Sequence, residues 1–376
     1  MEGTYDVKIA RSVVLILGNG FDLDLGLRTS YKDFYESRYC PKTYPAPLII
    51  HLNTRWPDGL DKVRWYDLEN ELLNYFLKIK EEYPKVNDVI TSKEAEFLNK
   101  VSLDNLRRDR YANYDGEIES LMKKNLLSIS DLTTFANIEI PCLDDLKHSS
   151  VWRDQKALSL IKEGLSKHLA EIEQEPIRDG SLAFAILGVL MDLSGVSVYN
   201  FNYTELPYMR ADQDEKIHYV HGKIDEENII IGTKDDKRYN DNYDFLQKSF
   251  APSFNPPSVV YSLLASNEIV IFGHSLGRND SQYFKAFFKE QTSLTNTRKK
   301  TITIFTKDEK SEVDIKRSLQ EMTDYNLSAL YGMNEINIIK SSTLVHDRRP
   351  LAKFLKRFIN DDIVISSILH RLKFRA

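Results

Sequence analysis

The pattern of hydrophobic and polar positions predicts strands and helices in alternation. The apolar run at residues 13–17 is rich in β-branched side chains and has the length of a buried parallel strand. Further strands are predicted at 196–201, 217–220, 229–232, 268–272, 301–305 and 336–339. Helices are predicted at 182–193, 259–266, 281–289 and 313–322, and two more close the chain. This alternation predicts an α/β fold, with a parallel sheet and helices on both of its faces.

A long helical region separates the first predicted strand from the others. After a helix at 31–35, residues 40–60 contain several prolines and are predicted to form a loop. Helical patterns then follow at 65–76, 94–106, 118–127 and 155–172. Because strand patterns are nearly absent from 60 to 180, we predict a helical insertion there. The polar and aromatic stretch 233–257 is interpreted as a flap.

The first predicted strand runs into the tight turn Gly18-Asn19-Gly20, which Asp22 and Gly26 follow. Glycine lets a backbone come close to a phosphate or a ribose, and the N–H groups of such a turn can point into a crevice. The dinucleotide motif Gly-x-Gly-x-x-Gly is not met, because Leu23 stands where the third glycine belongs. No Gly-Lys-Ser/Thr follows, so this is not a P-loop either. The turn indicates either a ligand loop or a plain strand–helix connection.

Three later predicted strands also end in polar, small or glycine residues. These ends are Asn202-Tyr203-Thr204, His221-Gly222 and Gly273-His274-Ser275. Ligands of open parallel sheets bind at the carboxyl ends of the strands, so neighbouring strands would place all four ends in one crevice. An imidazole has an unperturbed pKa of about 6.5 and can act as a base near neutral pH. Each residue alone also fits a turn or a helix cap, and their convergence favours a site.

Composition bounds the class of protein. The 376 residues carry a net charge of −5, which gives no global case for nucleic-acid binding and leaves a local basic patch open. Cys40 and Cys142 are the only cysteines and give no metal-binding spacing. The N-terminus has no apolar signal region, and no apolar run approaches the ~20 residues of a membrane helix. We expect a cytoplasmic protein with no membrane partner.

Four segments, in the same order along the chain, resemble sirtuin motifs. Gly18-Asn19-Gly20-Phe21-Asp22, with Gly26 further on, is similar to the glycine-rich sirtuin opening. Phe201-Asn202-Tyr203-Thr204 and Val220-His221-Gly222 resemble the Thr-Asn-Tyr/Phe-Asp and catalytic His-Gly motifs of SIR2-like bacterial defence proteins. Gly273-His274-Ser275-Leu276 resembles their late nucleotide contact.

A closer resemblance is to the bacterial abortive-infection AbiH family. That family shares the Gly-Asn-Gly-Phe-Asp-Leu opening and the Trp-x-Asp-Leu/Phe-Glu element, here Trp65-Tyr66-Asp67-Leu68-Glu69. It also has Phe-Asn-Tyr-Thr, His-Gly and Phe-Gly-His-Ser-Leu, the last completed here by Asp280. The motifs match in order from residue 13 to about residue 290.

The resemblance implies a SIR2-like Rossmann domain formed by residues 1–60 and 181–345. A helical insertion at 61–180 and C-terminal helices at 346–376 complete the expected organisation. The implied function is that of an antiphage abortive-infection effector. It would bind NAD or a related nucleotide and hydrolyse it at the N-glycosidic bond. The expected partners are a nucleotide and either a second copy of the chain or a phage-derived trigger.

The resemblance also assigns roles to individual residues. His221 would be the base that acts on a ribose hydroxyl, and Asn202 would hold the ribose or a water molecule. The remaining nucleotide contacts would come from Gly18, Asn19, Gly20, Phe21, Asp22, Gly26, Tyr203, Gly273, His274, Ser275 and Leu276.

Departures from the sirtuin pattern leave alternatives open. The four-cysteine zinc module of deacetylase sirtuins is missing, so neither zinc nor protein deacetylation is expected. A carboxylate at Asp22 would repel a pyrophosphate and would suit a ribose hydroxyl, a metal or a different nucleotide. One alternative is a metal-dependent nuclease with Asp22, Asp67, Glu69 and Asp280 as ligands. Another is a non-catalytic sensor of a nucleotide or a phage component.

Overall fold

The computed structural model describes most of the sheet-forming chain and part of the helical region. The residues described are 12–44, 46–53, 64–82, 150–207, 211–224, 226, 228–235, 242–296 and 298–373. The helices predicted at 94–106 and 118–127 lie outside the described residues.

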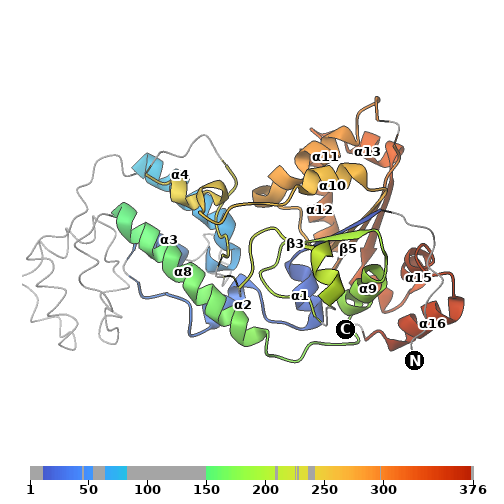
Figure 1. Ribbon diagram of the computed structural model, residues 1–376. Helices are drawn as coiled ribbons and strands as arrows, with labels where there is room; N and C mark the ends of the chain where they lie inside the picture. The colour runs from blue at the N-terminus through green and yellow to red at the C-terminus, as the bar shows by residue number, and fades with distance from the viewer. Residues whose placement is uncertain are drawn as a thin grey trace, which may run out of the picture. The chain divides into compact units, whose positions relative to one another are not determined.

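Six strands form one sheet in the order β3-β2-β1-β4-β5-β6, and every neighbouring pair is parallel (Figure 1). The strands are β1 (Val13–Leu17), β2 (Val196–Asn200), β3 (Ile217–Tyr219), β4 (Glu268–Phe272), β5 (Thr301–Thr306) and β6 (Glu335–Lys340). This is the strand order of Rossmann dinucleotide-binding sheets, in which the order reverses between the first and fourth strands. The predicted α/β fold with a parallel sheet is confirmed.

The central strand β1 is buried on both of its faces. Val13, Leu15 and Leu17 belong to one hydrophobic cluster, together with residues of the helices α9 (Leu182–Met191), α15 (Arg349–Leu355) and α16 (Asp362–Arg371). Val14 and Ile16 belong to a second cluster, which includes residues of α10 (Val259–Ala265), α11 (Lys285–Glu290) and α12 (Glu309–Met322). Successive side chains of a strand point to opposite faces, so an unbroken apolar run serves both clusters. Figure 1 shows the two groups of helices on opposite sides of the strands.

The described residues divide into two compact units. The sheet unit takes the described residues within 1–30, 169–229 and 253–376, and the helical unit takes those within 31–168 and 230–252. The helices of the sheet unit are α1 (Asn19–Leu25), α9 (Leu182–Met191), α10 (Val259–Ala265), α11 (Lys285–Glu290), α12 (Glu309–Met322), α13 (Leu327–Met333), α14 (Ser341–Leu344), α15 (Arg349–Leu355) and α16 (Asp362–Arg371). The helical unit contains α2 (Tyr31–Glu36), α3 (Pro47–Asn53), α4 (Leu68–Glu82) and α8 (Ser150–Ile172) up to residue 168.

Buried polar contacts attach residues 230–252 to the helical unit. The hydroxyl of Tyr243 donates to the carboxylate of Asp154 over 3.3 Å, and the hydroxyl of Tyr75 donates to the same oxygen over 2.5 Å. The fully buried ammonium of Lys248 lies 3.1 Å from the carboxylate of Glu69. These contacts explain why this unit includes 230–252 and differs in extent from the predicted insertion at 61–180.

Several predicted elements differ from the structure. Residues 229–232 do not form a strand, and only an isolated bridge joins Thr233 to Gln247 nearby. Helix α3 lies where a proline-rich loop was expected, because Pro47 is its first residue and a proline is tolerated there. The helix predicted at 281–289 is divided into a 3-10 turn, η9 (Arg278–Tyr283), and α11. Among the described helices, none is long and apolar enough to cross a membrane.

Candidate functional site

The four polar strand ends predicted to converge do lie on neighbouring strands. The strands β3, β2, β1 and β4 are adjacent and parallel, so their carboxyl ends are at the same edge of the sheet. The residues that follow them are Val220-His221, Phe201-Asn202, Gly18-Asn19 and Gly273-His274. This edge includes the point between β1 and β4 where the strand order reverses, which is where open α/β sheets bind ligands.

The backbones after β1 and β4 are in direct contact. The N–H of Gly20 donates to the carbonyl of Gly273 over 2.9 Å. A Cβ atom added to Gly20 would lie 2.6 Å from the Cα of Gly273, and one added to Gly273 would lie 2.4 Å from the carbonyl carbon of Gly20. Gly273 also has a φ of 65°. Both positions therefore require glycine because the two loops pack backbone against backbone.

This packing uses the amide groups that the sequence offered to a phosphate. The N–H of Gly18 donates to the carbonyl of Phe272 over 3.0 Å, and the N–H of Phe21 donates to that of Gly18 over 2.8 Å. With the amide of Gly20 also bonded, three of the backbone donors at the opening of the turn are directed at the protein itself. A ligand at this turn would have to meet other atoms, such as the exposed side chain of Asn19, which accepts a hydrogen bond from Thr29.

Asp22 joins the loop after β1 to the loop after β2. Its side chain is 2% exposed and accepts hydrogen bonds from the amide of Asn202 over 2.9 Å and from the hydroxyl of Thr204 over 2.7 Å. Burial raises the pKa of Asp22 to about 7, although both hydrogen bonds act in the opposite direction. The residue expected to select the ligand is thus engaged inside the protein.

Asn202 is held by the same network. Its side-chain nitrogen donates to Asp22 and also to the carbonyl of Gly18 over 3.1 Å, and its own backbone N–H donates to the side chain of Asn200. An amide nitrogen has two hydrogens, so both are committed to these two acceptors. In this arrangement Asn202 positions the two loops, and only its side-chain oxygen is available for a ligand hydroxyl or a water molecule.

Two histidines from different strand ends share one carboxylate. Nε2 of His221 lies 3.0 Å from one oxygen of Asp280, and Nε2 of His274 lies 3.4 Å from the other. The backbone N–H of Leu276 donates to Nδ1 of His274 over 2.9 Å, which places the proton of the neutral ring on Nε2, facing the carboxylate. We call His221, Asp280 and His274 the His–Asp–His group.

Aromatic rings surround the His–Asp–His group. The ring centre of Phe201 lies 5.4 Å from that of His221 and 4.5 Å from that of His274. Tyr283 packs edge-on against His221 at 5.8 Å. Both imidazoles are 5% exposed or less, whereas the side chain of Asp280 is 18% exposed. Charge interactions inside such an apolar shell are less screened than at the surface.

The remaining residues predicted to contact the nucleotide have mixed positions. Tyr203 is half-buried, with its ring 6.5 Å from that of His221, and Ser275 is exposed. Leu276 is buried, and Gly26 ends α1 with a φ of 96°, so both have local structural roles. Asp280 was predicted only as a metal ligand of the alternative nuclease and not as a partner of the two histidines, although its place in the family motif was a signal for it.

The proposed metal ligands are divided between the two units in the part of the chain that the structure describes, with Asp22 and Asp280 in the sheet unit and Asp67 and Glu69 in the helical unit. Within this described part, no group of three His, Cys, Asp or Glu side chains is arranged to hold a metal ion. Asp67 accepts hydrogen bonds from Asn70, and Glu69 pairs with Lys248.

Comparison with known protein families supplies an identity for this arrangement. The family model of bacteriophage abortive infection AbiH matches residues 14–305, more than half of the chain. The chain belongs to the AbiH family. Membership implies a role in antiphage abortive infection. The matched residues include β1 from Val14 onward, all of β2 to β4 and every residue of the His–Asp–His group, so the site lies inside the matched region. No curated protein and no solved structure matches this AbiH protein.

The backbone contact at Gly273 predicts a severe loss of stability in Gly273→Ala. The new Cβ would overlap the backbone of Gly20 and would force a strained φ, so we expect a loss of about 2–4 kcal/mol. Urea unfolding followed by circular dichroism measures this loss. The matched control is Gly332→Ala in α13, where an added Cβ meets nothing within 4 Å. Equal stability of the two variants would contradict the steric argument.

The raised pKa of Asp22 predicts a pH-dependent stability. The folded state holds a proton that the unfolded state releases near pH 3.8, so stability falls as the pH rises from about 4 to about 7. Each pKa unit of the shift corresponds to about 1.4 kcal/mol, so the fall in the free energy of unfolding is up to about 4 kcal/mol. Asp22→Asn, which cannot ionise, should not show this fall. It should match the wild type at pH 3, below the unfolded-state pKa, and exceed it at pH 8.

Urea midpoints at both pH values provide the measurement for Asp22. The exposed Asp314→Asn on α12 is the control and should follow the wild-type curve. Parallel curves for the wild type and Asp22→Asn would show that the carboxylate does not titrate in this range.

Proposed function

We propose that this AbiH protein is an abortive-infection effector that hydrolyses the N-glycosidic bond of NAD or a related nucleotide. The observation that carries the proposal is the hydrogen bond between His221 and Asp280 at the carboxyl edge of a sheet with Rossmann strand order. The four-motif resemblance to SIR2-like defence enzymes supports the choice of reaction. The location of the site supports a nucleotide as the substrate, because open sheets of this order bind nucleotides at this edge.

The reaction breaks the bond between the ribose C1′ and the nicotinamide nitrogen, whose electron pair leaves with the neutral base. Water forms the new bond to C1′ and loses a proton, so the products are nicotinamide, ADP-ribose and one proton. The transition state resembles an oxocarbenium ion, so the site must stabilise positive charge and accept the proton. The proposed acceptor is the imidazole of His221, acting on a ribose hydroxyl or on the water.

Asp280 would give His221 its orientation and its basicity. When Nε2 of His221 donates its hydrogen to Asp280, Nδ1 is the ring atom that takes up a proton. The carboxylate then stabilises the imidazolium that forms, in the same way as the acid of a catalytic triad. Asp280 is therefore assigned as a positioning residue of this reaction.

Asn202 and Asp22 have a supporting role in the proposal. Their hydrogen bond joins the loops after β1 and β2. In the proposal the ribose lies beside these two loops. The side-chain oxygen of Asn202 is the atom we assign to a ribose hydroxyl or to the attacking water. Asp22 maintains this orientation and does not itself contact phosphate.

Incubation of the purified full chain with NAD tests the proposal. We expect nicotinamide and ADP-ribose, detected by liquid chromatography, and a rate reduced at least 100-fold in His221→Gln and in Asp280→Asn. The exposed His346→Gln is the matched control and should retain the wild-type rate. A His221→Gln protein with full activity would remove His221 from the mechanism.

Other outcomes decide between the functional classes. Nucleotide binding in a calorimeter without product, with or without a phage lysate, would identify a sensor instead of an enzyme. Cleavage of DNA or RNA that EDTA abolishes would identify a metal-dependent nuclease.

A further inference from the structure

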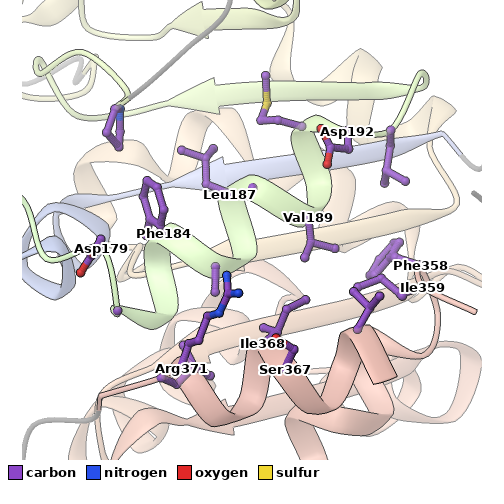
Figure 2. A pocket seen from close by; sticks show the side chains of 18 of the residues that line it. Asp179, Phe184, Leu187, Val189, Asp192, Phe358, Ile359, Ser367, Ile368 and Arg371 are labelled. Carbon is purple, nitrogen blue, oxygen red and sulfur yellow. The ribbon is translucent and has the colours of Figure 1, made fainter. Parts of the chain in front are cut away.

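A pocket of about 490 Å³ lies within the sheet unit, away from the His–Asp–His group. Its walls come mainly from α9 and from the C-terminal segment that contains α16 (Figure 2). Apolar side chains make most of these walls, among them Phe184, Leu187, Phe358 and Ile368. The volume is in the range of pockets that bind small molecules.

One wall contains a glycine in the interior of a helix. Gly188 lies in α9 between Leu182 and Met191, and an added Cβ would meet no atom within 4 Å. Glycine weakens a helix relative to alanine, and here no protein atom requires the small residue. The bare backbone at Gly188 instead enlarges the pocket and lets a ligand lie directly against α9.

A single cationic side chain points into the pocket. Figure 2 shows the guanidinium of Arg371 directed from the end of α16 toward α9. Among the described residues, no hydrogen bond or ion pair is formed by this guanidinium. The two acidic residues of the lining, Asp179 and Asp192, come before and after α9, and Figure 2 shows them at its opposite ends. The positive charge therefore faces the middle of the apolar wall.

We propose that this pocket binds a small amphipathic anion, with an apolar body against α9 and one anionic head group at Arg371. The apolar walls and the bare backbone at Gly188 accommodate a hydrocarbon chain or a fused aromatic body. The guanidinium fits a carboxylate or a sulfonate with two parallel hydrogen bonds. This site is separate from the proposed nucleotide site and does not depend on the proposed function.

Calorimetric titration of the full chain with decanoate tests the site. Decyltrimethylammonium has the same chain length and the opposite charge, and it should bind at least fivefold more weakly than decanoate. Arg371→Gln removes the positive charge and leaves a shorter polar side chain, so it should weaken decanoate binding at least fivefold without weakening the binding of the cation. Arg317→Gln, on the exposed face of α12, is the matched control and should bind as the wild type does.

A second variant tests the cavity itself. Gly188→Leu fills the open space beside α9 and favours the helix, so it should stay folded by circular dichroism and lose at least tenfold in decanoate affinity. Gly332→Leu, in α13, has equal open space outside the pocket and is its control.

Three results would overturn the proposal. They are no heat of binding with decanoate, equal affinity for the cation, and equal affinity in Gly188→Leu. Sedimentation gives a fourth such result. If Gly188→Leu, but not Gly332→Leu, had a lower sedimentation mass than the wild type, the pocket would be covered in the wild type by a second copy of the chain.

Discussion

The contact between the backbones at Gly20 and Gly273 is the constraint on which this edge of the sheet depends. It brings the loops after β1 and β4 together at the point where the strand order reverses. Because no side chain separates the loops, their amides and carbonyls bond to one another. Side chains from the next strand ends then carry the chemistry of the edge. Asn202 and Asp22 extend the contact toward β2, and the His–Asp–His group extends it toward β3.

Polar groups at this edge are buried in pairs or in larger networks. Asp22 has two donors around its carboxylate, and Asp280 has an imidazole beside each oxygen. A buried charge without such partners would be strongly destabilising. The network around Asp22 gives the edge its shape, while Asp280 is the more exposed carboxylate and lies beside two bases. The same edge of the sheet thus carries a structural network around Asp22 and the His–Asp–His group, whose side chains can transfer protons.

The sequence predicted the sheet better than the details of its edge. The apolar runs of the strands and the helices between them reflect burial on both faces, which leaves a local pattern at 13–17 or 268–272. The convergence of the four strand ends was predicted for parallel strands that are neighbours, and the sheet order supplies that adjacency. The use of the Gly18 and Gly20 amides by the loop after β4 could not be predicted, because residues 18 and 273 are distant in the chain. The contact of Asp280 with both histidines was missed for the same reason. Residues 229–232 were wrongly predicted as a strand, because an apolar run also occurs in buried segments that are not strands.

Strand spacing gives the position of Asp280 a further meaning. The ends of β3 and β4 are three strands apart, or roughly 14 Å at the usual spacing in a sheet. His221 and His274 follow these two strands, yet a single carboxylate touches both rings, so their loops must bend toward each other over the ends of β2 and β1. Asp280 therefore acts as a crosslink between the two halves of the sheet, β1 to β3 and β4 to β6. A molecule that spread these halves apart would break one of the two imidazole contacts of Asp280, so the spacing of the halves and the integrity of the His–Asp–His group depend on each other.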